Sequence, residues 1–353
     1  MGLLALGLGL VTIVVGAELF TNGVEWLGRR LGLAEGAVGG VLAAVGTALP
    51  ETVIPLVAIL MAGSAAGAAG TEIGVGAILG SPFMIATLAM FMTGLGVIFW
   101  RRRRASGLLM TVDRSALAVD VRYFFVAYAI ALSAALLPAD LGAVRYLAAG
   151  ASLIVYGAYV RRHLTADAQP GDEGGVELTP LRLGRLDVRH YRAGPAAPRT
   201  GTIVLQAAVA LALIIGGAIV FVDAVQALSL GLGVPPALLA LLIAPVATEL
   251  PETLNSLIWV RQNKDTLAMA NLTGALVFQA SIPTAVGITL ASEAWVLTSE
   301  NVLWFASAAM AFASVAAIFL VAGGTALTGR RLLVGGAFYA GFLVLVASSV
   351  VAV

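Results

Sequence analysis

Long apolar runs dominate this chain and are separated by short polar segments. Ala, Leu, Gly and Val follow one another without the apolar–polar alternation of a membrane β-strand, and about 20 such residues suffice for a helix to cross the hydrocarbon layer. The pattern predicts an all-α polytopic membrane protein with ten transmembrane helices. The predicted spans are 3–27, 36–62, 72–99, 117–137, 141–160, 202–229, 234–260, 266–291, 301–322 and 332–352.

Almost all of the basic residues fall in alternate loops, with Arg145 as the clear exception, and this pattern supports the count of ten. They follow the first, third, fifth, seventh and ninth spans, at Arg29–Arg30, Arg101–Arg104, Arg161–Arg199, Arg261–Lys264 and Arg330–Arg331. Because basic loops stay in the cytoplasm, both termini are predicted to lie outside a cytoplasmic membrane. The run Arg101–Arg104 is expected to face anionic lipid head groups.

Composition narrows the possible functions. Hydrophobic residues make up 60% of the chain, charged residues make up 11%, the net charge is +1, and there is no cysteine. Disulfides, thiolate metal sites and cysteine nucleophiles are therefore excluded. The charge balance gives no reason to expect a nucleic acid, and no obligatory protein partner is evident. No phosphate loop, HExxH or nucleophile motif is present, so an enzyme with a resident cofactor is not expected.

A short motif occurs twice, inside two of the apolar runs. Gly46–Thr52 reads GTALPET, and 201 positions later Ala247–Thr253 reads ATELPET. Five spans lie between equivalent points, so the second copy must enter the membrane from the opposite side, as in inverted-repeat transporters. The predicted parts are a five-helix repeat at 1–160, a linker at 161–200 and a second repeat at 201–353.

The linker is polar and rich in Pro and Gly, and it is too short to be a dependable folded domain. It holds both histidines of the chain, His163 and His190. We expect these two imidazoles to be solvated.

Each copy of the motif places a glutamate beside a proline at membrane depth. A charge there costs about 2.5–3.5 kcal/mol, so Glu51 and Glu252 are functional candidates. A single glutamate can be a structural hydrogen-bonding group, but two matched copies favour a binding site. Thr47 and Thr248 precede these glutamates by four residues, and each proline leaves a carbonyl without its helical donor.

Carboxylate, hydroxyl and carbonyl groups are all oxygen ligands, which hard cations such as Ca²⁺ and Na⁺ prefer. Glu249 adds a third carboxylate three residues before Glu252. Like charges this close repel each other, so a bound cation or a proton must neutralise part of the charge.

The segments VGTALPETVIP and VATELPETLNS, on inverted five-helix halves joined by a polar linker, resemble the α-repeats of the cation/Ca²⁺ exchanger superfamily, in particular its sodium/calcium exchanger branch. The resemblance implies that the helix after each motif completes the ion sites. In Glu72–Ile85 the family pattern keeps Gly76, Gly80 and Ser81, whereas Ala77, Pro82 and Ile85 replace expected asparagines. In Thr266–Gln279 it keeps Asn271 and Gly274, with Ala275 for serine and Gln279 for the terminal acid or amide.

The resemblance implies a set of ion ligands for this chain. They are Glu51, Glu252, Thr47, Thr248, Ser81, Asn271, Glu249 and Gln279. Glu249 is expected to supply the acid that is missing near Gln279.

The expected function is a secondary antiporter that exchanges Ca²⁺ for Na⁺ by alternating access, in contact only with membrane lipids and small inorganic cations. Two alternatives remain open. The same site could be coupled to H⁺, because grouped carboxylates share protons readily. A protein of another class, a cation channel, would pass ions without a counter-ion.

Overall fold

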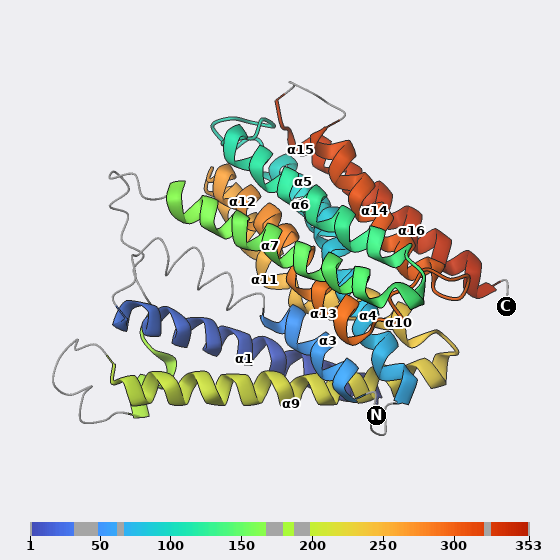
Figure 1. The fold of residues 1–353 in the computed structure, drawn as a ribbon. Helices are drawn as coiled ribbons and strands as arrows, with labels where there is room; N and C mark the ends of the chain where they lie inside the picture. Colours follow the sequence, from blue (N-terminus) through green and yellow to red (C-terminus); the bar gives the residue numbers. More distant parts are fainter. Residues whose placement is uncertain are drawn as a thin grey trace.

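The computed structural model describes residues 2–31, 49–61, 67–166, 179–186, 198–320 and 326–351. Apart from one isolated bridge, Leu109–Thr328, the regular elements of these residues are helices (Figure 1). In chain order they are α1 (Gly2–Arg30), α3 (Leu49–Met61), α4 (Gly67–Met84), η2 (Ile85–Ala89), α5 (Met90–Trp100), α6 (Arg114–Ala135), η3 (Ala139–Leu141), α7 (Gly142–Ala166), η4 (Arg182–Leu186), α9 (Thr200–Leu232), α10 (Pro236–Thr248), α11 (Leu250–Arg261), α12 (Asp265–Gln279), α13 (Ile282–Leu290), α14 (Val302–Phe319), α15 (Gly329–Leu332) and α16 (Val334–Val351).

Nine helical segments of the described residues are long and apolar enough to cross a membrane, and each matches a predicted span. The remaining predicted span, 36–62, is represented by the shorter apolar helix α3, and its residues up to 48 lie outside the described part. The prediction of an all-α membrane fold is confirmed. The count of ten agrees with nine spans and α3.

Two of the predicted spans are broken in the middle. Span 234–260 consists of α10 and α11 with Glu249 between them, and span 266–291 consists of α12 and α13. A proline occupies one of the first two positions of both α11 and α13. Proline suits the first turn of a helix but cannot donate the hydrogen bond that would continue the preceding one.

Helices α1 and α9 lie side by side and run in opposite directions (Figure 1). A Cβ built on Gly9 would lie 3.0 Å from the carbonyl oxygen of Gly217, and one on Gly16 would lie 3.0 Å from that of Ala210. The 201-residue offset of the repeat relates these two pairs: Gly9 corresponds to Ala210, and Gly217 corresponds to Gly16. The two helices are thus related by the inverted repeat, and their glycines allow the backbones to approach closely.

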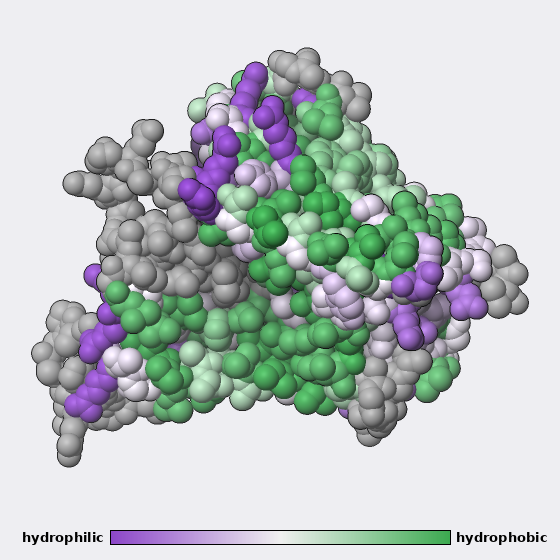
Figure 2. All heavy atoms as spheres, viewed as in Figure 1, coloured by the Kyte–Doolittle hydropathy of each residue, from purple (hydrophilic) through white to green (hydrophobic). Residues whose placement is uncertain are grey.

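Polar groups gather at the two ends of the bundle. Figure 2 shows apolar residues across the middle of the face in view and hydrophilic residues toward its two ends. At the arginine-rich end, the backbone N–H of Ala105 donates to Asn263 Oδ1 at 3.0 Å. At the other end, the N–H of Leu297 donates to the carbonyl of Ala135 at 2.8 Å. Loops that the sequence placed on one side of the membrane therefore meet at one end of the molecule.

One arginine of the run at 101–104 points inward. Both side chains of the Arg104–Asp265 pair are fully buried, and their two N–H···O contacts are 2.7 Å long. Arg104 also donates to the carbonyl of Val260 at 2.6 Å. The expectation of a lipid contact is wrong for Arg104, because its planar fork matches a carboxylate that the α11–α12 turn supplies. Arg101–Arg103 are exposed.

Part of the polar segment between the halves packs on α1 and α9. Asn22 of α1 donates to Thr179 Oγ1 at 3.0 Å, and the backbone N–H of Leu183 donates to Gln206 Oε1 of α9 at 2.8 Å. Gln206 in turn donates to Asn22 Oδ1 at 3.0 Å. These bonds hold η4 against both helices.

The expectation of solvated histidines holds only in part for His163, whose side chain is 37% exposed but also contacts a buried carboxylate, and His190 lies outside the described residues. His163 is on α7, which continues past the predicted boundary at 160. Its Nε2 lies 3.4 Å from the buried Asp120 of α6. No local sequence pattern predicts this contact, because the two residues come from different helices.

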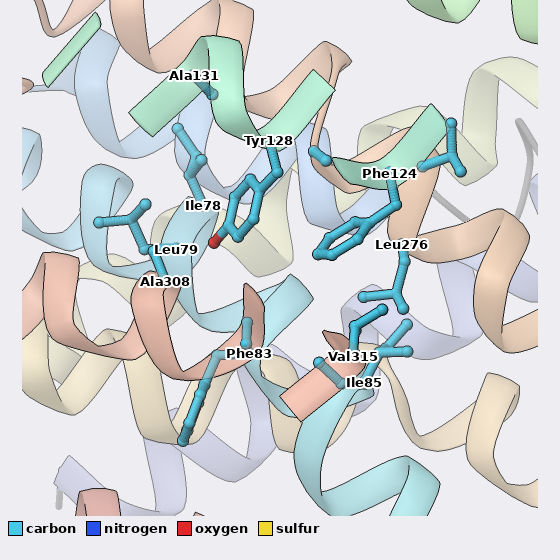
Figure 3. Packing of buried hydrophobic residues seen from close by; sticks show 14 of the residues in the cluster. Ile78, Leu79, Phe83, Ile85, Phe124, Tyr128, Ala131, Leu276, Ala308 and Val315 are labelled. Atoms are coloured by element: carbon cyan, nitrogen blue, oxygen red, sulfur yellow. The ribbon is translucent and has the colours of Figure 1, made fainter. Parts of the chain in front are cut away.

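The apolar core surrounds α4. Figure 3 shows Ile78, Leu79 and Phe83 of α4 packed among side chains of α6, α12 and α14. On its other faces α4 meets α3 and α10 through glycine: a Cβ on Gly74 would lie 3.0 Å from the carbonyl of Pro55. The next turn of this span is the π-helical segment η2, whose Ala86 carbonyl accepts a hydrogen bond from Ser314 at 2.6 Å. Single π-helical turns often accompany functional sites.

Gly76→Ala is expected to destabilise the protein. The added Cβ would lie 2.2 Å from the backbone carbonyl oxygen of Ala237, so α4 and α10 would have to separate. Overpacking of this kind costs about 1–3 kcal/mol or more, and the unfolding temperature in detergent should fall by about 5 °C. Gly150→Ala on α7 is the matched control, because nothing lies within 4 Å of its Cβ. An equal loss in both variants would contradict the close contact.

Candidate cation site

Three buried glutamates meet where α3 approaches the break between α10 and α11. Glu51 lies in the first turn of the described helix α3, Glu252 lies in the first turn of α11, and Glu249 occupies the break itself. Their exposed fractions are 3%, 6% and 1%. One carboxylate oxygen of each lies within 4.8 Å of the others. The structure therefore brings together the glutamates of both motif copies and the additional acid of the second.

Three further polar side chains surround the glutamates. Thr248, the last residue of α10, faces the Glu51 carboxylate, and Ser81 of α4 lies beside Glu249. Gln279, the last residue of α12, donates its Nε2 to Glu249 Oε1 at 2.7 Å. All three side chains are buried. The family resemblance implied that Glu249 supplies the acid missing near Gln279, and the two side chains are in contact.

Several carboxylate and amide oxygens in this cluster receive no well-formed hydrogen bond. Within the described residues, neither oxygen of Glu51 receives a well-formed hydrogen bond, and the same holds for Glu249 Oε2 and Gln279 Oε1. Buried polar atoms normally find partners, and unpaired buried charges are costly. A cluster with more acceptor oxygens than donors is complementary to a cation. Carboxylate, amide and hydroxyl oxygens are the ligands that Ca²⁺ and other hard cations take.

One predicted site residue, Asn271, stands apart from this cluster. Asn271 of α12 donates its Nδ2 to the backbone carbonyl of Glu252 at 3.0 Å and to Ser256 Oγ at 3.2 Å. Its amide nitrogen thus links α12 to α11 instead of facing the carboxylates. Thr47 lies outside the described residues.

Ser256 is a residue that the sequence reasoning missed. It is fully buried, and it donates to the carbonyl of Ala268 on α12 at 3.1 Å. It lies four residues after Glu252, hence on the same face of α11, and this spacing of polar residues in an apolar helix could have identified it. Its contacts fix the rotation of α11, which carries Glu252.

Comparison with known proteins gives one family. The family model described as sodium/calcium exchanger protein matches residues 1–163 and 202–351. The match leaves out 164–201, which nearly coincides with the polar segment between the halves.

Solved structures of two exchangers share the fold. A crystal structure of the H⁺/Ca²⁺ exchanger CAX is 17% identical, covers 97% of this chain and 81% of that chain, and gives a TM-score of 0.69. A structure of the sodium-calcium exchanger NCX_Mj is 18% identical, covers 98% of both chains, and gives a TM-score of 0.55. At these identities the likeness concerns the fold alone.

A curated relative matches over a shorter region. An uncharacterized membrane protein of Methanocaldococcus jannaschii is 34% identical over 88 residues, which are 23% of this chain and 29% of that protein. The matched region therefore covers less than a third of the length of this relative.

Glu249→Gln is expected to stabilise the protein in the absence of divalent cations. The variant removes one of three like charges, while its amide oxygen can still accept the hydrogen bond from Gln279. Each kcal/mol of relieved repulsion should raise the unfolding temperature in EDTA by about 2–4 °C. Glu293→Gln, at an exposed position, is the control of equal charge change. A lower unfolding temperature for Glu249→Gln would mean that the negative charge is structural.

Proposed function

Since the chain belongs to the sodium/calcium exchanger family, we propose that it exchanges Ca²⁺ for Na⁺ across the membrane, at the site formed by Glu51, Glu249 and Glu252. The single observation that carries the proposal is the meeting of these three buried carboxylates at the interface of the two inverted halves. Transporter sites of this type lie at the repeat interface, on interrupted helices. The proposed ligands also include Thr248, Ser81 and Gln279. Thr47 remains a candidate by its place in the first motif.

The charge of the site explains why exchange is expected instead of leak. By simple addition of insertion values, three charged carboxylates at membrane depth cost on the order of 8–10 kcal/mol. Loading with Ca²⁺ or with monovalent cations offsets most of this cost. The loaded forms can therefore change their orientation far more readily than the empty form, and transport of one ion is coupled to return of the other.

Helices α1 and α9 are the proposed moving part. Most of the helix contacts of α1 are with α9, and the two approach each other through glycines. The pair can thus be displaced as a unit past the bundle that holds the carboxylates. Such a displacement would open the site to one side of the membrane and then to the other.

Sodium is the proposed coupling ion because Na⁺ takes the same oxygen ligands and because the matching family is described as sodium/calcium exchangers. Protons are a second candidate. Ala77 and Ala275 stand where the family resemblance expects an amide and a hydroxyl, which removes possible Na⁺ ligands. Three carboxylates within 4.8 Å of one another also share protons readily.

We further propose that the arginine-rich end faces the cytoplasm. Both termini lie at the opposite end of the bundle in Figure 1 and would then be outside the cell. The proposed surroundings are the lipids of the cytoplasmic membrane, with small cations as the only other partners.

Purified protein in lipid vesicles should accumulate Ca²⁺ when an outward Na⁺ gradient is imposed at constant pH, and not when a pH gradient is imposed without Na⁺. Uptake of ⁴⁵Ca²⁺ is the measurement. Glu51→Gln and Glu252→Gln should each abolish it. Breaking a buried charge pair costs about 3–5 kcal/mol, which corresponds to a factor of about 100 or more in Ca²⁺ affinity.

Glu293→Gln is again the control, and it should transport like the wild type. Uptake driven only by the pH gradient would replace Na⁺ by H⁺ as the coupling ion. Flux down the Ca²⁺ gradient without any counter-ion would indicate a channel. Full uptake by Glu51→Gln would rule out the proposed site.

A further inference from the structure

Another buried carboxylate, besides Asp265, lies outside the proposed cation site, toward the arginine-rich end of the bundle. Asp120 of α6 is 2% exposed and has partners on two other helices. It accepts hydrogen bonds from Thr273 Oγ1 of α12 at 2.6 Å and from the Tyr159 hydroxyl of α7 at 3.2 Å. His163 Nε2 of α7 lies 3.4 Å from the same carboxylate. Asp120 thus connects three helices.

His163 is the group of this cluster that solvent protons reach. Its side chain is 37% exposed, whereas that of Asp120 is 3% exposed. Histidine changes its charge between about pH 5 and 8. Its ring packs on Tyr159 with 4.3 Å between ring centres, and its Nδ1 lies 3.2 Å from the Tyr159 carbonyl oxygen. These contacts hold the imidazole in place beside Asp120.

The other groups around His163 differ in charge and in helix. On α6 they are Asp120 and Tyr123, the latter packed edge-on against Tyr159. On α7 they are Tyr156, Tyr159 and the adjacent Arg162, and α12 contributes the neutral hydroxyl of Thr273. Of these side-chain types, imidazole is the one whose charge ordinarily changes between about pH 5 and 8.

Protonation of His163 changes the net charge around the buried Asp120 carboxylate. When the imidazole is protonated, the buried carboxylate has a cation at 3.4 Å; when it is neutral, that cation is lost, and the hydroxyl donors Thr273 and Tyr159 remain. An unpaired buried charge is costly, so the contact among α6, α7 and α12 is stronger in the protonated form. Thr273 offers an alternative arrangement. Its single hydroxyl proton can go to Asp120 or to the carbonyl of Met269 at 2.9 Å.

Helix α12 connects this cluster to the proposed cation site. Gln279 follows Thr273 by six residues, about 9 Å along the helix. Its amide donates to Glu249 Oε1 at 2.7 Å. The Arg104–Asp265 pair holds the turn at the beginning of α12. The hydrogen bond from Thr273 to Asp120 then fixes α12 between Asp265 and Gln279.

We propose that Asp120 is a positioning residue for the cation site, and that protonation of His163 on the cytoplasmic side strengthens its hold on α12 and thereby the affinity for Ca²⁺. The inference rests on the function proposed above. The stabilisation is present when His163 is charged and is lost as the pH rises through its titration. A preorganised site binds more tightly than one whose ligands must first be ordered.

The experiment compares Ca²⁺ affinity at pH 6 and pH 8, measured from the Ca²⁺ dependence of the unfolding temperature of the full chain in detergent. His163→Gln should equal the wild type at pH 8. At pH 6 it should bind Ca²⁺ about two- to fivefold more weakly, as expected for loss of a partly exposed ion pair. His190→Gln is the matched control, because His190 is the other of the two histidines in the chain. This variant should bind Ca²⁺ like the wild type at both pH values.

Asp120→Asn tests the partner of the histidine. It should remove the same pH-dependent part of the affinity, and the double variant His163→Gln/Asp120→Asn should be no weaker at pH 6 than the weaker single variant. The comparison is between variants at one pH, so protons that compete with Ca²⁺ for the central glutamates act equally on both.

The outcomes separate this inference from the proposed function. If Ca²⁺ stabilises the wild type but His163→Gln follows it at both pH values, the role of Asp120 and His163 is overturned and the cation site stands. The same conclusion follows if His190→Gln changes as much as His163→Gln. If Ca²⁺ fails to stabilise the wild type at either pH, the proposed function is overturned together with this inference.

Discussion

Repulsion among Glu51, Glu249 and Glu252 is the constraint on which the rest of the molecule depends. Three acids with carboxylate oxygens within 4.8 Å of one another, each nearly inaccessible, cannot all be charged in an apolar surrounding without compensation. The neighbouring side chains supply few donors, and they add further acceptor oxygens. The site is therefore stable only with positive charge, and this requirement links ion binding to the orientation of the protein in the membrane.

The scaffold around the site holds these acids together. Glycines allow α4 to pass close to α3 and α10, so that Ser81 reaches Glu249. Asn271 and Ser256 tie α12 to α11 through backbone carbonyls and through each other. The Arg104–Asp265 pair fixes the turn between these two helices. These supports thus surround the group of oxygens that is proposed to bind cations.

The sequence allowed the fold and the centre of the candidate site to be predicted, because both are written in local patterns. Apolar runs gave the helices, and the repeated LPET segment indicated that Glu51 and Glu252 would meet. The pairing of Gln279 with Glu249 followed from the family resemblance. The inward turn of Arg104 and the contact of His163 with Asp120 could not be predicted, because each joins helices far apart in the chain. The hydrogen bond from Asn271 to the Glu252 carbonyl likewise depends on how α12 lies against α11.

The pairing of α1 with α9 has a consequence for biosynthesis. Residues 31–199 separate the two helices, so the ribosome must make most of the first half and the polar segment before α9 exists. Until then α1 lacks the neighbour with which it makes most of its contacts, and Asn22 lacks Gln206. The first half consequently cannot complete its packing before α9 has been made. The two repeats are units of sequence, whereas the packing of α1 depends on both of them.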